Sequence, residues 1–425
     1  MKSNRKDITN QRIERITMQH AVVGIDIAKD VHAAQMTDFR GRSLTPRHLS
    51  FSNTLEGFEK FLRWAREAQS KHRLTSLLIG LEPTGHYWFN FANWLLEQGI
   101  EVVLVNPVTT HRNKENRDNS PSKNDPKDAL VIADVVSRGY YTDYLAQAAV
   151  FDRLKTLMSN REYWVKQGIS LGNRIVRWID LYFPEFRQVF PDWTTLRSLA
   201  SLRACPLPCD LKGRSVEEVM DLWRKQGMKR AAGVSGRAKA AVLLATAARS
   251  IGDTRAVEEA RQDLGHLLQT YDNVMAMLDE MDEALQSLLE EIPLAEQLRS
   301  IRGLGDLTVA AILAGAGDLR LYAHGRQLLR RAGLNLAECT SGTSKGKIKL
   351  SKRGDSTLRK HLYWGMLSLL RQNPDFKRWH ANNQARGLKK QASLFKLIGK
   401  LARILIGMVQ RGETYRGADF SPVAA

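Results

Sequence analysis

Long apolar runs, cysteines and acidic residues are all scarce in this chain of 425 residues. No run of about 18 apolar residues occurs, the polar N-terminus lacks the apolar segment of a signal peptide, and no lipidation motif ends the chain. These absences exclude the membrane-anchored classes of protein. Only three cysteines are present, which excludes a disulfide framework and is typical of a reducing compartment. We therefore expect a soluble, intracellular protein.

Acidic residues are outnumbered by basic ones, 45 to 64, and the formal net charge is +19. Residues 296–425 contain 24 basic and 8 acidic residues, so an excess of 16 positive charges lies in this one segment. A solvated basic face would explain an isolated run, but not an excess sustained over this length. With membranes excluded, the charge indicates that the partner is nucleic acid.

The N-terminal part of the chain alternates between strand and helix periodicity. The predicted order is strands at 20–27, 31–36 and 47–52, a helix at 54–69, a strand at 76–82, a helix at 86–97, a strand at 101–106 and a helix from 125. Three meandering strands followed by alternating helices and strands predict a mixed sheet flanked by helices, the arrangement of ribonuclease-H-like domains. We assign this α/β domain to residues 1–150.

The remainder of the chain has helical periodicity. Residues 151–292 are expected to form an all-α middle region. Apolar residues spaced three and four apart over 256–292 predict an antiparallel or intersubunit coiled coil, or a plain bundle helix. Residues 293–425 are expected to form a basic, mainly α domain. In this domain Gly303 and Gly305 separate two predicted helices, a pattern like the helix-hairpin-helix, in which glycines let the backbone approach a phosphate.

Four acidic residues lie where the predicted fold would bring them together. Asp26 ends the first strand and Glu82 ends the fourth, and these strands are neighbours in a ribonuclease-H-like sheet. Asp125 and Asp128 are three residues apart and so share one face of the helix that is expected to cross those strand ends. Such carboxylates are the hard oxygen ligands that two Mg²⁺ ions about 4 Å apart need for in-line phosphoryl transfer.

Each carboxylate also has an ordinary structural explanation. An acid at a strand end is commonly solvated or caps a helix, and Asp125 before Pro126 is suited to be an N-cap. The coincidence of all four positions favours the metal site. The weaker candidates, which fall outside the strand ends or a further turn along the helix, are Asp30, Asp38 and Asp134.

The sequence around the first two carboxylates supports a specific resemblance. The order Asp, Glu, Asp-x-x-Asp, with GIDIAKD from Gly24 and EPTG from Glu82, resembles the RuvC-like domain of the DEDD transposases of the insertion sequence 110 family. The resemblance implies that Asp26, Glu82, Asp125 and Asp128 are the metal-binding tetrad.

Serines lie among glycines and cations in the basic domain, in TSGTSKGK from Thr340 and LSKRGD from Leu350. From composition alone, the simpler interpretation is a phosphate-contacting loop in which serine is a hydrogen-bond donor. The candidate nucleic-acid contacts are Gly303, Gly305, Lys345, Lys347, Lys352 and Arg353. This segment also resembles the C-terminal domain of the same transposase family, which implies that Ser341 is the nucleophile. The weaker candidates for that role are Ser344, Ser351 and Ser356.

The resemblance implies a transposase or recombinase in which the metal-bound carboxylates and Ser341 form a composite site. Ser341 would attack a DNA phosphate to give a covalent phosphoserine, so strand exchange would need no ATP. The resemblance further implies an RNA that is transcribed from the element and pairs with donor and target DNA. It also implies a homodimer or homotetramer, with 256–292 as a contact, in the bacterial cytoplasm.

Three other functions remain open. A RuvC-like, structure-selective endonuclease would use the same tetrad with water as the nucleophile. A kinase of the related actin-like fold also begins with a Gly-Ile-Asp strand, but it needs two Gly-rich phosphate hairpins and we find one Gly-rich segment. A purely structural nucleic-acid binder would leave the four carboxylates unexplained.

Overall fold

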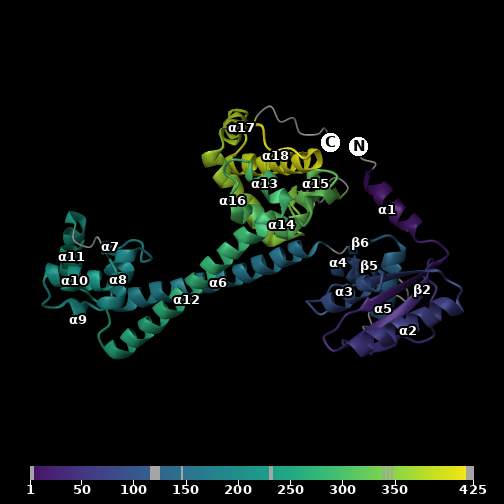
Figure 1. The fold of residues 1–425 in the computed structure, drawn as a ribbon, viewed down its shortest axis with the longest axis horizontal. Helices are drawn as coiled ribbons and strands as arrows, with labels where there is room; N and C mark the ends of the chain where they lie inside the picture. Colours follow the sequence, from purple (N-terminus) through teal and green to yellow (C-terminus); the bar gives the residue numbers. More distant parts are fainter. Residues whose placement is uncertain are drawn as a thin grey trace. The chain divides into compact units, whose positions relative to one another are not determined.

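The computed structural model describes residues 4–114, 125–144, 147–228, 233–337, 340–341, 344–345 and 348–417. The chain divides into two compact units, residues 1–146 and 147–425, and each unit is described by itself. Figure 1 shows the order of the elements by colour, with the N-terminal sheet in purple and blue. Among the described residues, no helix is both long and apolar enough to span a membrane.

The N-terminal unit contains a mixed sheet of six strands in the order β3-β2-β1-β4-β5-β6. The strands are β1 (His20–Asp26), β2 (Val31–Asp38), β3 (Leu49–Ser52), β4 (Ser76–Leu81), β5 (Glu101–Val105) and β6 (Tyr141–Tyr144). The pairs β1–β4 and β4–β5 are parallel, and the other neighbouring strands are antiparallel. Parallel neighbours need crossover connections, which helices supply here.

Helices cover both faces of this sheet. The helices are α1 (Asn4–Arg15), α2 (Leu55–Lys71), α3 (Phe89–Glu97), α4 (Pro107–Asn113) and α5 (Asp125–Ser137). Phe58 and Phe61 of α2 and Phe91 of α3 pack on one face, whereas α5 packs on the other through residues such as Ile132 and Val136. The mixed sheet flanked by helices is therefore confirmed.

The predicted elements of this unit agree with the observed ones to within a few residues, and three others were not predicted. Strand β6 has the sequence Tyr-Thr-Asp-Tyr, which contains no apolar run, and it pairs with β5 at the end of the described sheet. Helix α4 is short, and it begins because the Asn106 side chain accepts a hydrogen bond from the N–H of Val108 while Pro107 occupies the first turn. The polar helix α1 has no extended apolar run either.

The second unit is mostly helical, as predicted. Its helices are α6 (Ala149–Tyr182), α7 (Phe186–Val189), α8 (Leu196–Ala204), α9 (Pro208–Leu211), α10 (Val216–Lys225), α11 (Val234–Ala247), α12 (Val257–Glu290), α13 (Pro293–Arg299), α14 (Asp306–Ala316), η1 (Leu319–Leu321), α15 (Gly325–Arg331), α16 (Ser356–Gln372), α17 (Pro374–Ala385) and α18 (Lys390–Arg411). Four two-residue strands interrupt it: β7 (Leu336–Ala337), β8 (Thr340–Ser341), β9 (Ser344–Lys345) and β10 (Lys349–Leu350).

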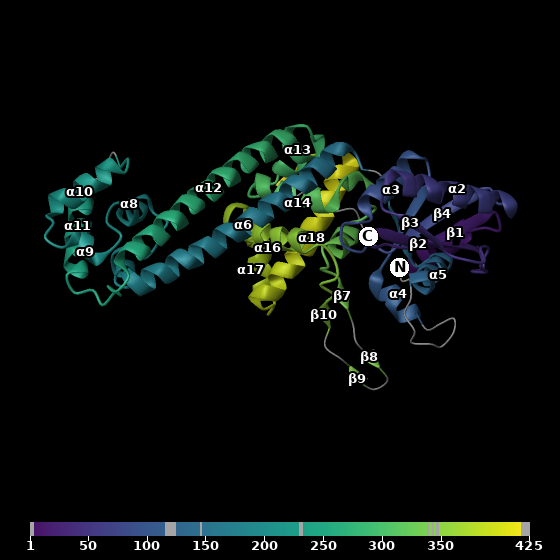
Figure 2. The same cartoon turned by 90° about the horizontal axis from the view of Figure 1, so that it is seen from below.

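Helices α6 and α12 form an antiparallel pair within the chain. Arg161 Nε lies 2.6 Å from Asp282 Oδ1, and Trp178 donates its indole N–H to the carbonyl of Ala260 at 2.8 Å. The contact positions rise along α6 as they fall along α12, which fixes the antiparallel direction. Figure 2 shows the two helices side by side. The segment 256–292 is therefore an intrachain partner of α6, and an intersubunit contact through it stays a prediction.

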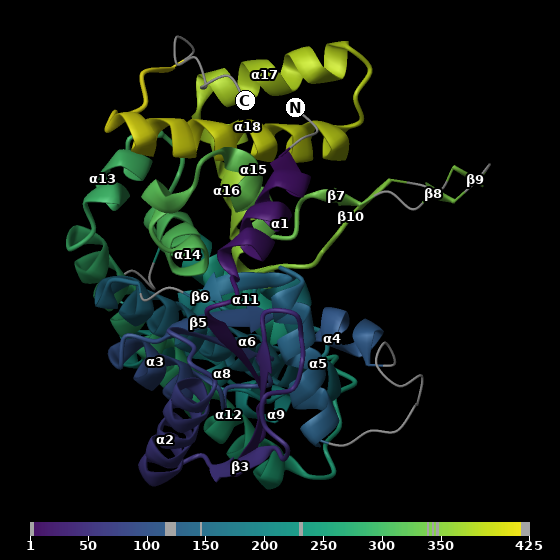
Figure 3. The ribbon, with the colours of Figure 1, turned by 90° about the vertical axis from the view of Figure 1, so that its right-hand side faces the viewer.

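Two separate apolar cores lie in the second unit. One encloses Trp178 of α6, Trp223 of α10 and the buried Cys205 among helices α7–α11, and burial raises the pKa of the Cys205 thiol to about 12. The other joins α13–α18 with one end of α6 and α12. Helices α17 and α18 of this second core lie side by side (Figure 3). Whether these cores belong to independent domains, as the predicted boundary near residue 292 requires, stays a prediction.

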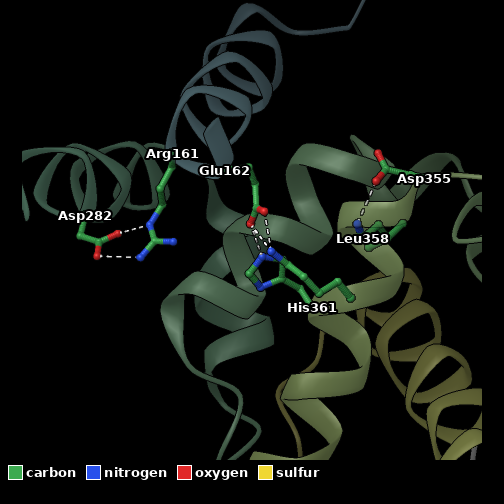
Figure 4. A network of polar contacts seen from close by, with 7 residues as sticks. Arg161, Glu162, Asp282, Asp355, Leu358 and His361 are labelled. Atoms are coloured by element: carbon green, nitrogen blue, oxygen red, sulfur yellow. Dashed lines mark hydrogen bonds and ion pairs between the residues drawn. The ribbon is translucent and has the colours of Figure 1, made fainter. Parts of the chain in front are cut away.

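A partly buried ion network joins α6 to α16 (Figure 4). Glu162 accepts hydrogen bonds from Lys360 Nζ at 2.6 Å and from His361 Nε2 at 3.0 Å. Burial alone would raise the pKa of Glu162, but the two hydrogen bonds outweigh it and hold the pKa below its usual value. Burial is also the main reason that the pKa of His361 is lowered. The carboxylate is therefore a charged, fully bonded link between two helices.

We expect Glu162→Gln to lower the free energy of unfolding by about 1–3 kcal/mol at pH 7, because Lys360 and His361 lose a charged acceptor. Since the native pKa lies below the unfolded value, this stabilisation is present above the unfolded pKa and disappears as the pH falls through the native pKa. Urea unfolding at pH 7 and below about pH 4 measures the difference. Glu280→Gln, at an exposed position of α12, is the control. An equal loss at both pH values would contradict the assignment.

Candidate active site

Strand pairing brings Asp26 and Glu82 to the same edge of the sheet. The parallel register of β1 and β4 pairs Gly24 with Gly80 and Ile25 with Leu81. Asp26 is the last residue of β1 and Glu82 directly follows β4, so each lies one residue beyond the last paired position. Both residues are partly exposed. Adjacent strands lie about 4.8 Å apart, so the two carboxylates come from neighbouring points of the backbone.

Alternation along β1 directs Asp26 to the face that carries α5, and the same period, continued one residue past β4, predicts this face for Glu82. Val22 and Leu78 lie in the core beneath α5, whereas Ile25 and Leu81 lie in the core on the opposite face. Because side chains alternate with a period of two, Asp26 follows Val22 onto the α5 face. Glu82 continues the same alternation after Leu78. The predicted partner helix therefore covers the face to which the two strand-end carboxylates belong.

Helix α5 approaches this face through two glycines. A Cβ atom on Gly24 would lie 2.1 Å from the carbonyl oxygen of Ala129, and one on Gly80 would lie 2.4 Å from Val136 Cγ2. No other residue fits such a close approach of helix and strand. Asp128 directly precedes Ala129, so Gly24 sets how closely the start of α5 lies against β1, whereas Gly80 admits the end of α5 to β4.

Asp128 is a buried carboxylate with one oxygen bonded and one oxygen without a partner. Asp128 is 6% exposed, and its Oδ2 lies 2.7 Å from Nζ of Lys114, the residue that directly follows α4. The other oxygen, Oδ1, is buried and has no hydrogen-bond partner in the described part of the chain. A buried unsatisfied carboxylate oxygen is costly, and a bound cation would satisfy it.

The fourth predicted carboxylate is only partly described. Helix α5 begins at Asp125, which is where the sequence predicted it, but the Asp125 side chain lies outside the described part of the structure. Among the described side chains, no three acidic, histidine or cysteine groups lie close enough together to bind a metal. The complete tetrad therefore stays a prediction, supported by the register of β1 with β4 and by the free oxygen of Asp128.

The rival acidic residues have other surroundings. The Asp38 carboxylate accepts hydrogen bonds from the backbone N–H groups of Arg40 and Arg42, at 2.9 and 2.8 Å, and so closes the turn after β2. Asp30 is exposed in the loop between β1 and β2. Asp134 lies in α5, more than a turn beyond Asp128. Asp38 therefore has a structural role, and neither of the others lies at a parallel strand end.

His32 and Lys114 are two residues near the site that the sequence analysis missed. His32 of β2 is fully buried against Phe51, and its Nδ1 accepts a hydrogen bond from the N–H of Ala28, in the loop after Asp26. Burial lowers the pKa of His32, so the ring is neutral and holds this loop. The sequence did contain a signal for His32, because a histidine among the alternating apolar residues of a predicted strand is expected to be buried. No sequence pattern distinguishes Lys114 from other surface lysines.

The predicted nucleophile lies in a small hairpin. Strands β8 and β9 pair antiparallel, with Ser341 opposite Ser344 and Thr340 opposite Lys345. The side chains of Ser341, Ser344 and Lys345 lie outside the described part of the structure, as does the whole of Lys347. The β7–β10 pair is the base of the same hairpin (Figure 2). The role of Ser341 therefore stays a prediction.

The base of the hairpin is held by the motifs that flank it. Ser351 donates its hydroxyl to Asn335 Oδ1 at 2.7 Å, and the N–H of Lys352 donates to the carbonyl of Gly333 at 2.9 Å. Lys352 has φ of +53° and Gly333 has φ of +67°. Arg359 of α16 donates to the carbonyl of Ala332 at 2.8 Å. Ser351 is therefore a structural hydrogen-bond donor.

The other predicted phosphate contacts are partly explained by structure. Gly303 has φ of +95°, which favours glycine, and a Cβ there would lie 3.1 Å from Gln372 Cβ, a close contact. Gly305 is the N-cap of α14, and the first turn already holds Asp306, which accepts a hydrogen bond from Arg299 Nε at 2.7 Å. The helix-Gly-x-Gly-helix pattern is present, and its phosphate role stays a prediction. The structure describes the side chains of two of the predicted phosphate-contacting cations, Lys352 and Arg353, and both are exposed.

Comparisons with known proteins give consistent matches at both ends of the chain. Residues 23–184 match a family model of DEDD transposases of the IS110 type, and residues 295–381 match the model described as transposase IS116/IS110/IS902 family. The transposase for insertion sequence element IS1111A of Coxiella burnetii is 24% identical over 98% of this chain and 96% of its own. An uncharacterized 44.8 kDa protein of insertion element IS116 from Streptomyces clavuligerus is 23% identical over 91% of this chain and 94% of its own. The pilin gene-inverting protein of Moraxella lacunata is 27% identical over 37% of this chain and 47% of its own.

We expect Gly24→Ala to lower the free energy of unfolding by about 3 kcal/mol, because its methyl group would overlap the backbone of α5. Gly265→Ala is the matched control. A Cβ at Gly265 meets nothing within 4 Å on α12, so this change should leave stability equal or slightly raised. Urea unfolding of both variants measures the contrast. Equal stabilities would show that α5 does not pack against β1 at Gly24.

Lys114→Met should lower the free energy of unfolding by about 2–3 kcal/mol, because it leaves the buried Asp128 carboxylate without its cation. Adding Asp128→Asn should recover most of this loss, since no buried charge then remains. The exposed Lys71→Met is the control for loss of a lysine. Chemical unfolding of the wild type, Lys114→Met, Asp128→Asn and the double variant forms a double-mutant cycle. Additive effects of the two changes would contradict the pairing.

Proposed function

The chain belongs to the insertion sequence 110 family of transposases, and we propose that it cleaves and rejoins DNA strands with a metal-bound carboxylate tetrad and a serine nucleophile. Family membership indicates an enzyme of DNA transposition. The observation that carries the finer proposal is the shared sheet edge of Asp26 and Glu82, on the face where α5 begins. The unpartnered oxygen of Asp128 supports the same site.

The residues at this edge suit a hard divalent cation. Asp26, Glu82, Asp125 and Asp128 offer carboxylate oxygens alone, which Mg²⁺ prefers over nitrogen or sulfur ligands. We assign Mg²⁺, as two ions, to these residues. When bound, the ions supply Lewis-acid stabilisation of charge on phosphate oxygens. Lys114 donates a hydrogen bond to one oxygen of Asp128, and the other oxygen has no partner among the described residues. His32 accepts a hydrogen bond from the loop that follows Asp26.

Ser341 is the proposed nucleophile. Its Oγ attacks the phosphorus of a DNA phosphodiester and loses its proton, and the bond from phosphorus to one deoxyribose oxygen breaks. That oxygen leaves as a hydroxyl, and a phosphoserine ester remains. A DNA hydroxyl then attacks the ester, the strand is rejoined, and Ser341 recovers its proton. Each step exchanges one phosphate ester for another, so no ATP is consumed.

The fold and the domain arrangement are parts of the same proposal. We assign the N-terminal sheet to the ribonuclease-H and RuvC-like class, because its three meandering strands precede two parallel ones and a helix crosses the catalytic face. The divisions at residues 150 and 292 separate this domain from the helical middle region and the basic C-terminal domain. The basic domain would contact DNA backbone through the glycines and cations named above.

The partners follow from the family and from charge. We propose donor and target DNA as substrates and an RNA from the same element as the guide, which the excess positive charge would accommodate.

A homodimer or homotetramer would form with the α6–α12 pair as a contact, because Tyr163 and Ile169 of α6 are exposed there, 55% and 60%. The named relatives come from bacteria, so we assign the protein to the bacterial cytoplasm.

The test is a DNA-linked protein band. The protein is expressed with its flanking DNA and RNA, supplied with Mg²⁺, denatured and resolved on a gel. We expect the band in the wild type and its complete loss in both Ser341→Ala and Asp26→Ala, because one removes the nucleophile and the other a metal ligand. Ser356→Ala, at an exposed serine of α16, is the matched control and should retain the band.

The reaction products separate the competing mechanisms. Cleavage without a protein-linked band in Ser341→Ala would show that water is the nucleophile, as in a structure-selective endonuclease. Cleavage that survives Asp26→Ala would overturn the carboxylate site. Omitting the RNA tests the guide separately, since loss of cleavage at the correct target is expected without it.

A further inference from the structure

A cavity of about 340 Å³ lies between α15 and α18 in the C-terminal part of the second unit. It is separate from the carboxylates and from the serine hairpin in sequence. Its lining residues are Ala323, His324, Gly325, Arg326, Leu329, Gly399, Arg403, Ile406, Gly407 and Gln410. Leu329 and Ile406 give it an apolar wall. A volume of this order is typical of small-ligand sites.

The charge of the lining is entirely positive. Arg326 and Arg403 are exposed at the cavity, and no acidic residue is among the residues that line it. Among the described residues, Arg403 donates to the carbonyl of Gly399 in its own helix, at 3.3 Å, and to no other acceptor. Neither arginine has an ion-pair partner among the described residues. Two unpaired guanidinium groups beside an apolar wall complement a ligand that is both anionic and apolar.

His324 is among the residues that line the cavity. His324 Nδ1 is buried and has no hydrogen-bond partner in the described part of the chain. Gln410, on the opposite helix, already donates to the carbonyls of Tyr322 and Ala323, at 2.9 and 3.0 Å, so its amide is held in place. The lining therefore offers the imidazole of His324 and the amide of Gln410 as polar groups beside the apolar wall.

Glycine at position 399 is not explained by packing within the chain. Glycine inside a helix is less stable than alanine, yet a Cβ here would meet only Leu329 Cδ1, at the ordinary distance of 3.7 Å. Gly325 differs, because a Cβ there would lie 2.6 Å from the backbone nitrogen of Arg403. Gly325 therefore permits the close contact of α15 with α18, whereas Gly399 leaves the cavity open.

We propose that this cavity binds one unpaired nucleotide of a DNA strand. The base packs on Leu329 and Ile406 beside the His324 ring, and the phosphates of the nucleotide contact Arg326 and Arg403. Unstacked bases are recognised in this way, by apolar or planar groups combined with cations. The assignment to DNA rests on the proposed function, because strand cleavage creates unpaired nucleotides at the exchange point.

The test compares a short fluorescein-labelled oligo(dT) with an abasic strand of equal length, by anisotropy at constant salt with the full-length protein. We expect the wild type to bind oligo(dT) about tenfold more tightly or better. Gly399→Met fills the cavity and should bring this ratio near one, without changing affinity for the abasic strand. Gly399→Ala should lower the ratio less and retain thermal stability. Arg403→Gln should weaken binding of both strands.

Gly265→Met, at an open position of α12, is the control and should keep the wild-type ratio. An unchanged ratio in both Gly399 variants would overturn the proposal. Tighter, Gly399-dependent binding of oligo(rU) than of oligo(dT) would overturn the assignment to DNA. The DNA-linked band in the same preparations separates the two proposals. If the DNA-linked band forms but the ratio of oligo(dT) to abasic affinity is unchanged in the Gly399 variants, the cavity proposal alone is overturned. If that ratio depends on Gly399 but no band forms, the serine mechanism alone is overturned.

Discussion

Parallel pairing of β1 with β4 is the constraint on which the N-terminal unit depends. It aligns the two strands so that both end at the same edge, and the period of two then assigns Asp26 to the face covered by α5. Helix α5 reaches that face only because Gly24 and Gly80 have no side chains in the way. One register therefore controls the strand ends, the depth of the helix and the position of Asp128. A shift by one residue would send the strand carboxylate to the opposite core.

Two carboxylates, the partly buried Glu162 and the buried Asp128, differ in how completely they are hydrogen-bonded. Both oxygens of Glu162 are bonded by Lys360, with His361 as a further donor, so this group is satisfied within the protein and links α6 to α16. Asp128 has a lysine partner too, but only on one oxygen, and the other is buried without a partner in the described chain. Burial of a charge is tolerated when it is paired, and an oxygen left over is the position where a cation is favoured.

The basic part of the chain follows the same principle of a rigid frame around a reactive or binding element. The serine hairpin starts and ends at a base in which Gly333, Lys352 and Ser351 are tied by hydrogen bonds, and Arg359 fastens that base to α16. The cavity between α15 and α18 has a comparable frame, since Gly325 brings the two helices into backbone contact while Gly399 leaves space beside it. Two glycines that the sequence does not distinguish therefore have opposite effects. Gly325 permits a close contact of the two helices, and Gly399 leaves space for the cavity.

Local patterns in the sequence were sufficient for most strands and helices of the N-terminal unit, apart from α1, β6 and α4, and for the helical second unit and the basic C-terminal segment. These features depend on the period of apolar residues and on charge, which are properties of neighbouring residues. The short elements β6 and α4 lacked such a signal. Only the tertiary structure decided that α12 pairs with α6 of the same chain, that Lys114 meets Asp128, that Ser351 bonds Asn335, and that a cavity lies beside Gly399. Each of these depends on contacts between residues far apart in the chain. Packing sets the distance between such residues, and the periodicity of a local sequence contains no information about it.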